Sequence, residues 1–293
     1  MKIARFEYEN KENYGIMQAD RLLPLPALGR HFKTVLPSRM EEFISDENAR
    51  KITELLLARA ESLELDRIAV PLTKVKLLAP IGQPPKILCL GLNYASHVSE
   101  TRAKQPEQPV IFMKPRTTIV GPNDKIVKRS FVKQLDYEGE LAVVIGKRTK
   151  DVAVSEALDH VFGYTILNDV SARDFQFRGS QWTPGKSFDS FAPTGPCIIT
   201  RDKLLNASHL SIKTWVNHEL RQNGTTNDMI FGVAEIVSYL SQIMTLEPCD
   251  IIATGTPSGV AMAMNPPKWL KNGDKVRIEI EGIGILENVV EDR

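Results

Sequence analysis

Apolar and polar positions along the chain follow two different patterns, and these divide it into two regions. The first region opens with two strand-like pieces, KIARFEYEN and YGIMQADRLLPL. The stretch SRMEEFISDENARKITELLLARAESL then repeats apolar residues, among them Ile52, Leu55 and Leu56, at three- and four-residue steps, which predicts a helix. Ser45 or Asp46 is expected to cap the later part of this helix. We therefore expect a small N-terminal α+β domain.

The second region is rich in short strands, and a proline-punctuated linker, VPLTKVKLLAPIGQPPK, leads into it. Its strand candidates end at Gly, Pro, Asn or Asp; they are KILCLG, PVIFMK, ELAVVIG, VFGYTILND, CIIT, LSIKTWVN, DIIATGT and KVRIEIEGIGILENVV. Only a few helical patterns interrupt them, such as SEALDHV and VAEIVSYLSQI. No glycine fingerprint or phosphate-binding loop leads a strand into a helix. We predict an α+β, mostly β fold with domains at residues 1–72 and 73–293.

Composition and charge exclude several classes of protein. The 293 residues are 42% hydrophobic and 25% charged, and the net charge is +1. This balance gives no basic field for nucleic acid or an anionic membrane surface. No stretch approaches the roughly 20 apolar residues of a membrane span, and the start MKIARFEYEN lacks an apolar signal-like run. The three Cys residues form no CxxC pair. We expect a cytoplasmic protein with reduced, buried thiols.

The stretch LDYEGELAVVIG combines a core strand with acidic residues at alternate positions. Alternate side chains of a strand share a face, so Asp136, Glu138 and Glu140 would crowd one small patch. Like charges this close raise a pKa or share a cation. Glu138 and Glu140 could supply two oxygen ligands to a hard divalent ion, and Asp169, at the end of an apolar strand, is the candidate third ligand. Alternatively, these acids are solvated edge residues that pair with Lys147 or Arg173.

The segment NYASHVSE places His97 and Glu100 three residues apart. On a helix the two side chains would share a face, and the carboxylate would orient the imidazole as a general base for water. A surface histidine without a catalytic role is the alternative. The polar segment TRAKQPEQP that follows is expected to form a mobile lid over bound substrate.

Six blocks, in this order, resemble the fumarylacetoacetate hydrolase family, in particular its bacterial members with a short N-terminal domain. They are ILCLGLNYASHVSE, IFMKPRTTIVGP, LDYEGELAVVIGK, GYTILNDVSARDFQ, QWTPGKSFDSFAPTGP and LEPCDIIATGTPSGV, and the similarity covers roughly residues 75–290. The resemblance implies a mixed β-sandwich roll that pairs into a homodimer. It also implies one divalent cation held by Glu138, Glu140 and Asp169, with magnesium expected first and manganese or calcium as alternatives.

The same resemblance implies roles for the other candidate residues. His97 and Glu100 match the dyad that activates water, and Lys186 matches a lysine that faces the metal and polarises the substrate. Asp136 is expected outside the ligand set, where it would orient the ligands. The expected substrate-binding residues are Arg173, Gln176, Lys114, and Gly255 and Thr256 of the GTPSG turn, which would bind a substrate carboxylate through backbone N–H groups and the Thr hydroxyl. Lys114 could equally be a surface charge.

The chemistry that these parts imply is cleavage of a carbon–carbon bond in small 2-oxo or 2,4-dioxo acids through a metal-stabilised enolate. The candidate reactions are hydrolysis of an acylpyruvate or fumarylpyruvate and decarboxylation of oxaloacetate. The His97–Glu100 pair favours hydrolysis, because a decarboxylase needs no activated water. An isomerase of the 2-hydroxyhepta-2,4-diene-1,7-dioate type in aromatic catabolism is the alternative enzyme. A non-catalytic metabolite-binding protein of the same fold is the second alternative.

Three positions depart from the family pattern. His218 follows Asn217 where relatives usually have Gly, so we expect a different turn type or local strain. Cys249 also stands in place of a usual Gly, so that turn must tolerate a side chain. Leu92 occupies a position that is often Arg in acylpyruvate-cleaving members, which weakens the match to their substrate handling.

Overall fold

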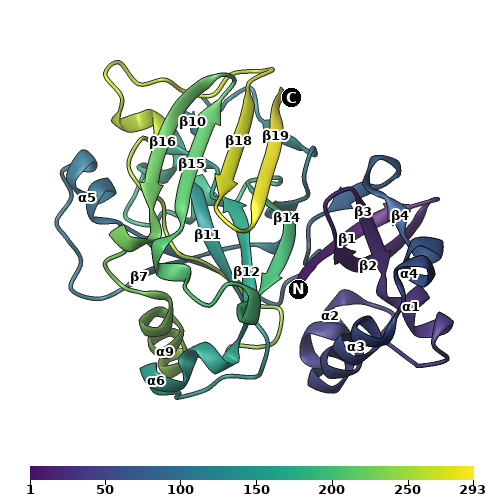
Figure 1. The fold of residues 1–293 in the computed structure, drawn as a ribbon. Coiled ribbons are helices and arrows are strands. Elements are labelled where there is room, and N and C mark those ends of the chain that lie inside the picture. Colours follow the sequence, from purple (N-terminus) through teal and green to yellow (C-terminus); the bar gives the residue numbers. More distant parts are fainter.

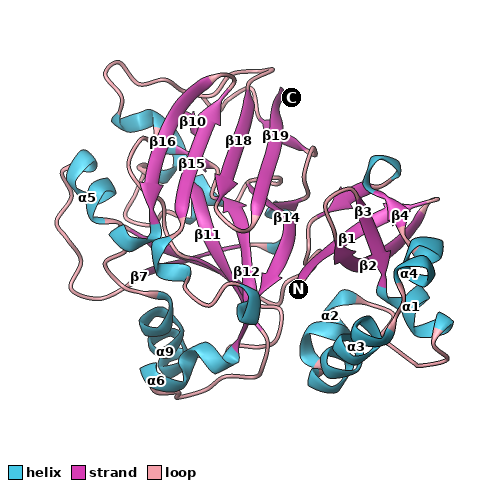
Figure 2. Cartoon of the chain, viewed as in Figure 1, coloured by secondary structure: helices cyan, strands magenta, loops and turns pink.

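The computed structural model of the chain contains two main sheets with helices around them (Figure 1). It describes the backbone of residues 1–293 and every side chain except those of residues 62 and 63. Figure 2 shows that sheet is the main component and that most helices are short. The predicted α+β, mostly β class is therefore confirmed.

The first region folds as a group of strands with helices packed beside them (Figure 1). Its elements are β1 (Lys2–Tyr8), β2 (Lys11–Met17), β3 (Arg21–Pro24), α1 (Leu25–His31), α2 (Met40–Ser45), α3 (Glu47–Arg59), α4 (Ser62–Ile68), β4 (Val70–Pro71) and the 3₁₀ turn η1 (Leu72–Lys74). Asp46 caps α3, because its carboxylate accepts a hydrogen bond from the backbone N–H of Ala49 at 3.0 Å. The predicted helix is thus broken into three, and Asp46 rather than Ser45 begins the middle one.

One of the predicted core residues of α3 is not in the core. Leu56 is buried and Ile52 partly buried, but Leu55 is 64% exposed. Successive residues of an α-helix point about 100° apart, so Leu55 and Leu56 do not face the same neighbour. The prediction that Leu55 belongs to the apolar face is therefore wrong.

The large sheet runs through both regions of the chain. Its 12 strands follow the order β4-β3-β2-β1-β14-β12-β11-β17-β6-β7, with β5 beside β1 and β8 beside β14. The strands not yet bounded are β5 (Lys76–Leu78), β6 (Ile87–Gly91), β7 (Val110–Lys114), β8 (Ile119–Val120), β11 (Gly139–Ile145), β12 (Val161–Asn168), β14 (Ala192–Thr200) and β17 (Ile251–Ala253). β1 pairs with β14, where Lys2 lies opposite Ile199. Because β1 extends the sheet of the second region, the division at residue 72 stays a prediction.

The second sheet has 5 strands in the order β16-β15-β18-β19-β9. These are β16 (Glu219–Thr225), β15 (Ser211–Val216), β18 (Lys275–Ile280), β19 (Gly284–Asp292) and β9 (Lys125–Lys128); β10 (Leu135–Asp136) and β13 (Ser171–Ala172) pair separately. The helices of this region are α5 (Ala95–Thr101), α6 (Val154–Ala157), α7 (Arg173–Gln176), α8 (Thr183–Lys186) and α9 (Val233–Ile243), with short 3₁₀ turns at Arg116–Thr118, Leu158–His160, Arg201–Lys203, Ala207–His209, Thr226–Asp228 and Ala261–Ala263.

The strand β11 is apolar on both faces because each face packs into a different core. Leu141 and Val143 belong to the core between the large sheet and the second sheet. Ala142 and Val144 face the core beneath the helices of the first region. A strand buried on both sides reads as a continuous apolar run, and each buried Val or Leu contributes about 1.5–3 kcal/mol. This double burial makes β11 a rigid support for the acids at its start.

The polar strand β16 was not predicted from the sequence. Its sequence, ELRQNGT, lacks an apolar face, and the strand lies at the edge of the second sheet. Edge strands are often polar, since charged side chains there discourage pairing with another chain.

Candidate active site

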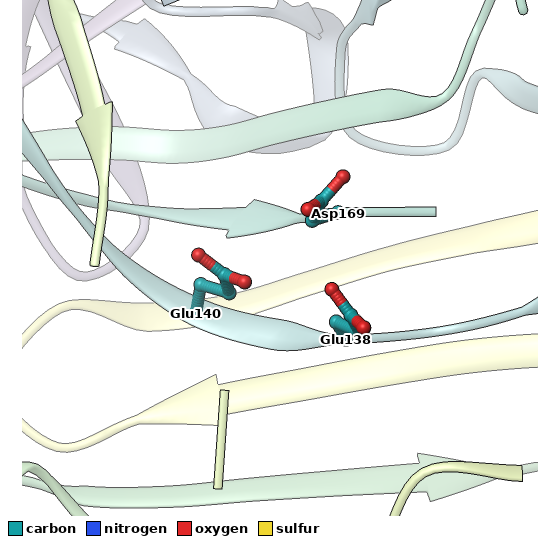
Figure 3. Close-up of side chains that lie close together, drawn as sticks. All are labelled: Glu138, Glu140 and Asp169. Atoms are coloured by element: carbon teal, nitrogen blue, oxygen red, sulfur yellow. The ribbon is translucent and has the colours of Figure 1, made fainter. Parts of the chain in front are cut away.

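Three buried carboxylates meet where β11 begins and β12 ends. Glu138 precedes β11, Glu140 lies on it, and Asp169 directly follows β12. One carboxylate oxygen from each lies within 4.8 Å of the other two, and all three residues are buried. Figure 3 shows the three carboxylates around a common space. The structure therefore brings together the three residues predicted as metal ligands.

Backbone pairing holds this arrangement in place. β11 and β12 are antiparallel neighbours with Gly139 opposite Asn168. Beyond that pair, the N–H of Asp169 donates to the carbonyl of Glu138 at 2.9 Å, and the N–H of Glu138 donates to Oδ1 of Asn168 at 3.1 Å. Side chains that leave such a fixed backbone are well oriented before any ligand binds.

Buried cations surround two of the three acids. Lys186 Nζ donates to Oε2 of Glu138 and to Oδ2 of Asp169, each at 2.7 Å. Lys114 Nζ also donates to Asp169, through Oδ1. Arg173 donates to Oε1 of Glu138 at 2.6 Å. Burial would raise the pKa of Glu138, but the charges of Lys186 and Arg173 outweigh burial and hold it well below its usual range.

Glu140 is less well compensated than its two neighbours. Its Oε2 accepts a hydrogen bond from the backbone N–H of Gly255 at 2.8 Å. Burial raises the pKa of Glu140 well above its ordinary value, and the charges of Asp169 and Glu138 raise it further. With Asp136, the cluster contains four buried acids. They face three buried cations, Lys114, Lys186 and Arg173. One negative charge thus lacks a partner.

A divalent cation fits this donor set. The three converging ligands are all carboxylate oxygens, the type that magnesium, manganese and calcium prefer. Burial and the charges of Asp169 and Glu138 disfavour the ionised form of Glu140, and a divalent cation would supply the positive charge that this carboxylate lacks. Each carboxylate oxygen has two lone pairs, so an oxygen that accepts from Lys186 can also coordinate a metal.

Asp136 contacts Arg173 and makes no direct hydrogen bond to Glu138, Glu140 or Asp169. Its Oδ2 accepts from Nε of Arg173 at 3.0 Å, and its Oδ1 accepts from the N–H of Ala261 at 2.8 Å. Burial would lower the pKa of Arg173, but Glu138 and Asp136 reverse this effect and raise it. The alternative interpretation, in which the acids pair with Arg173 at a solvated edge, is thus correct in part. Asp136 and Glu138 do pair with Arg173, but all three side chains are buried. Lys147 pairs instead with Glu47 on α3, at 3.8 Å.

The predicted His97–Glu100 pair forms on α5. Nδ1 of His97 lies 2.8 Å from Oε1 of Glu100, and Oε2 of Glu100 accepts from the N–H of Gly259 at 2.8 Å. α5 is itself anchored, since the N–H of Ser96 donates to Oδ2 of Asp228 at 2.9 Å. Because a carboxylate only accepts, the proton between the pair resides on Nδ1, which leaves Nε2 of His97 free to take another.

The GTPSG turn supports the acids of the site. The N–H of Gly255 donates to Glu140, and the hydroxyl of Thr256 donates to the carbonyl of Gly139 at 3.0 Å and accepts from Gln222 at 2.7 Å. These donors contact groups of the chain itself, and binding of a substrate carboxylate by Gly255 and Thr256 stays a prediction.

A cleft of about 230 Å³ opens over these residues. The predicted residues that line it are His97, Glu138, Glu140, Arg173, Gln176, Lys186 and Thr256. Lys114 and Asp169 are buried beneath this surface, and Lys114 donates to Asp169 and to the carbonyl of Val170 at 3.1 Å. Lys114 is therefore not the surface charge of the alternative interpretation, and it contacts an acid of the site rather than the cleft.

The cleft also has an apolar wall whose aromatic residues no sequence pattern indicated. It includes Phe112 and Trp182 together with Leu92 and Met262. The aromatic residues lie on segments far apart in sequence, so no local pattern could have grouped them. Thr101 and Ala103, at the start of the predicted lid segment, line the cleft as well, while closure of that segment stays a prediction.

The three departures from the family pattern all lie at turns with positive φ. Leu92 has φ 56° and Cys249 has φ 72°. Asn217, which precedes the third departure, His218, has φ 56°. His218 is not among the residues with positive φ, so the turn at Asn217 is not the type that requires positive φ at both central positions. The expected change of turn type is confirmed, and Cys249 does occupy a conformation that favours Gly.

Comparison with known proteins agrees with this geometry. Residues 86–291 match the protein family described as "Fumarylacetoacetate (FAA) hydrolase C-terminal". The oxaloacetate tautomerase YisK of Bacillus subtilis is 41% identical, and the alignment covers 99% of this chain and 100% of the relative. No helix of the described residues is long and apolar enough to cross a membrane.

Two solved structures are similar along the whole chain. The fumarylacetoacetate hydrolase of Exiguobacterium antarcticum superimposes with a TM-score of 0.84 at 39% identity and covers 100% of both chains. The maleylpyruvate hydrolase of Sphingobium sp. SYK-6, solved in complex with manganese(II) and pyruvate, has a TM-score of 0.80 at 32% identity and covers 100% of this chain and 99% of that chain. The fold that the resemblance implied is confirmed.

Proposed function

The chain belongs to the fumarylacetoacetate hydrolase family of enzymes, and we propose that it is a divalent-metal-dependent oxaloacetate tautomerase. The reaction moves a proton between C3 and the 2-oxo oxygen of a small 2-oxo acid. Like the diene-dioate isomerisation considered above, it transfers a proton and breaks no carbon–carbon bond. The tautomerase name of the Bacillus relative supports this choice among the reactions that the family resemblance left open.

The observation that carries the proposal is the position of the His97–Glu100 pair. His97 lines the same cleft as Glu138, Glu140 and Lys186, so a base faces the acids that would hold a cation. Nδ1 of His97 is oriented by Glu100 at 2.8 Å, and Glu100 is oriented in turn by Gly259. A base fixed in one tautomer beside a small cleft is what proton transfer next to a carbonyl requires.

Glu138, Glu140 and Asp169 would hold the cation, and we propose magnesium first, with manganese or calcium as alternatives. When bound, the ion supplies Lewis-acid polarisation of the 2-oxo group. The chain provides the remaining steps. His97 takes a proton from C3 through Nε2 and delivers it to the 2-oxo oxygen, and in the enol-to-keto direction it moves a proton from that oxygen to C3. Lys186 uses two N–H bonds on Glu138 and Asp169, so its third N–H can donate to the oxygen that gains charge.

The size of the cleft supports a small substrate. Its volume of about 230 Å³ is below the range of roughly 300–1,000 Å³ found for sites that take drug-sized ligands. Gln176 lines the cleft, and its Oε1 accepts from Nη1 of Arg173 at 2.8 Å. Its amide nitrogen therefore remains to donate to a substrate oxygen, and Arg173 acts through the orientation of Gln176.

Hydrolytic cleavage of an acylpyruvate is the second candidate. The base that takes a proton from C3 could instead activate water for attack on a 4-oxo group. The maleylpyruvate hydrolase of Sphingobium, solved with manganese and pyruvate, supports this reading. Oxaloacetate decarboxylation, diene-dioate isomerisation and metabolite binding without catalysis remain the further alternatives.

The test measures three reactions of the purified protein with magnesium or manganese. These are enol-to-keto conversion of oxaloacetate, its decarboxylation, and hydrolysis of acetylpyruvate. We expect acceleration of the first, and we expect its loss in His97→Ala. Cleavage of acetylpyruvate without tautomerisation would favour the hydrolase. Binding of oxalate without turnover of any 2-oxo acid would favour a non-catalytic role.

We also propose that the enzyme works in the cytoplasm as a homodimer. The family resemblance supports the dimer, and the composition supports the location. Light scattering and fractionation of cells test the two statements.

A further inference from the structure

The cleft has one wall that the proposed chemistry does not use. Gly91 ends β6, Phe112 lies on β7 and Trp182 precedes α8, and all three line the cleft. The rings of Phe112 and Trp182 meet edge to face, with centroids 5.7 Å apart and an angle of 74° between planes. Nζ of Lys186 lies 5.0 Å from the centre of the Phe112 ring. The wall therefore begins beside the ammonium group that contacts the metal-site acids.

Gly91 makes the close approach of Trp182 feasible. A Cβ atom at position 91 would lie 2.2 Å from Cζ3 and 2.7 Å from Cη2 of the indole ring. Gly91 is not among the glycines with positive φ, so glycine is needed here for space and not for backbone conformation. β6 lies between β17 and β7 in the large sheet, so the backbone that the ring contacts is held on both sides. The ring consequently has a rigid surface behind it.

We propose that Trp182, seated against Gly91, is a specificity-determining residue that limits the length of the substrate beyond its reacting carbons. The inference rests on the proposed function, since it concerns the tail of a 2-oxo acid bound next to Lys186. A short tail ends before the indole ring, whereas a longer tail meets it. The substrate class that follows is short-chain 2-oxo acids, and long acyl or aryl tails are excluded.

A chain-length series tests the proposal directly. The enol-to-keto conversion of acylpyruvates with acetyl, butanoyl and hexanoyl groups is compared for wild type, Trp182→Ala and Trp215→Ala. Trp215 lies on β15 against Arg277, and it serves as a tryptophan control away from the cleft. We expect the ratio of kcat/KM for the hexanoyl to the acetyl substrate to rise about tenfold or more in Trp182→Ala alone, as hydrophobic pockets discriminate by 10–200-fold per methylene. An unchanged ratio would overturn the proposal.

A double-mutant cycle tests the contact between the two residues. Gly91→Ala alone must displace the indole ring, so it should lower kcat/KM for the acetyl substrate. The same change in the Trp182→Ala background should cost much less, because the clashing ring is gone. Equal losses in both backgrounds would contradict the seating of Trp182 on Gly91.

Binding without turnover separates this inference from the proposed function. Calorimetry in the presence of Mn²⁺ compares pyruvate, 2-oxobutanoate and 2-oxooctanoate. If Trp182→Ala gains affinity for 2-oxooctanoate by about tenfold or more while no 2-oxo acid is turned over, the length limit stands and the proposed function fails. If wild type turns over oxaloacetate but Trp182→Ala relaxes neither binding nor kcat/KM, the length limit fails and the function stands.

Discussion

Nδ1 of His97 lies 2.8 Å from Oε1 of Glu100, and the second oxygen of Glu100 is held at 2.8 Å by the backbone N–H of Gly259. The imidazole is therefore positioned by an acid that is itself positioned by a distant turn. This chain of contacts connects α5 to the same GTPSG turn that holds Glu140 through Gly255. His97 and the three buried acids thus share one support.

Glu100→Gln should lower kcat for tautomerisation by about 10- to 100-fold with little change in KM, because an amide orients the imidazole less strongly than a carboxylate. His97→Ala should lower it by about 10²- to 10⁴-fold, the usual contribution of a general base. Steady-state kinetics with Mn²⁺ measures both. A His97→Ala enzyme with wild-type kcat would exclude His97 as the base.

Asp136→Ala should destabilise the protein by about 3–5 kcal/mol, because it leaves the buried charge of Arg173 without one of its two carboxylate partners. The backbone N–H groups of Tyr137, Ala261 and Met262 also lose their acceptor. Urea denaturation of chelator-treated protein measures the change.

An exposed pair provides the control for this prediction. Lys51 and Glu47 form an i,i+4 pair on α3 at 3.1 Å, with both side chains more than half exposed. Lys51→Ala should change the free energy of unfolding by no more than about 0.5 kcal/mol. Similar losses for the two variants would show that burial does not decide the effect.

Gly139→Ala should destabilise the protein by about 1–3 kcal/mol and weaken metal binding. A Cβ at this position would lie 2.4 Å from Oγ1 of Thr214, and the residue stands between Glu138 and Glu140. Oγ1 of Thr214 is buried and makes no hydrogen bond to any described atom. Thr214→Ala alone should therefore be nearly neutral, and in combination it should reduce the cost of Gly139→Ala. Additive costs in the double variant would contradict this explanation.

Native cysteines should react slowly with thiol reagents at pH 8. Burial raises the pKa of Cys197 to about 11 and that of Cys249 to about 12, and it raises the pKa of Cys89 as well. A pKa of 11 leaves about one thiolate in a thousand at pH 8, and that fraction grows as pH rises. Labelling with a disulfide reagent should be rapid only in denaturant, where all three thiols react. Rapid labelling of folded protein at pH 8 would show that a thiol is accessible.

The parts of the site that depend on short-range patterns were predictable from the sequence. Alternation along one segment placed Glu138 and Glu140 on one face, and helical spacing paired His97 with Glu100. Both patterns follow from local backbone geometry, which a few neighbouring residues determine. The position of Asp169 at the end of an apolar strand was also a local signal.

The parts that depend on contacts between distant segments were not predictable. Lys114 contacts Asp169 from 55 residues away, and Gly255 contacts Glu140 across 115 residues. No periodicity in the sequence encodes which strands become neighbours, so neither contact was expected. Trp182 and Phe112 were missed for the same reason, because their contact exists only once β6 and β7 lie beside α8.

The same distinction applies to the fold. Apolar runs predicted most strands of the second region, but their order in the sheets arises from non-local pairing. The pairing of β1 with β14, for example, joins the start of the chain to a segment about two hundred residues later. The polar β16 gave no apolar signal, and the exposed Leu55 gave a misleading one.

The central claim is that Glu138, Glu140 and Asp169 bind one divalent cation on which activity depends. The most direct measurement is calorimetric titration of Mn²⁺ into chelator-stripped wild type and Glu140→Gln, followed by the tautomerase assay on the same samples. The account predicts one ion per wild-type chain, loss of that binding in Glu140→Gln, and recovery of wild-type activity only as the ion is added. Full activity of the stripped enzyme, or equal Mn²⁺ affinity in Glu140→Gln, would contradict it.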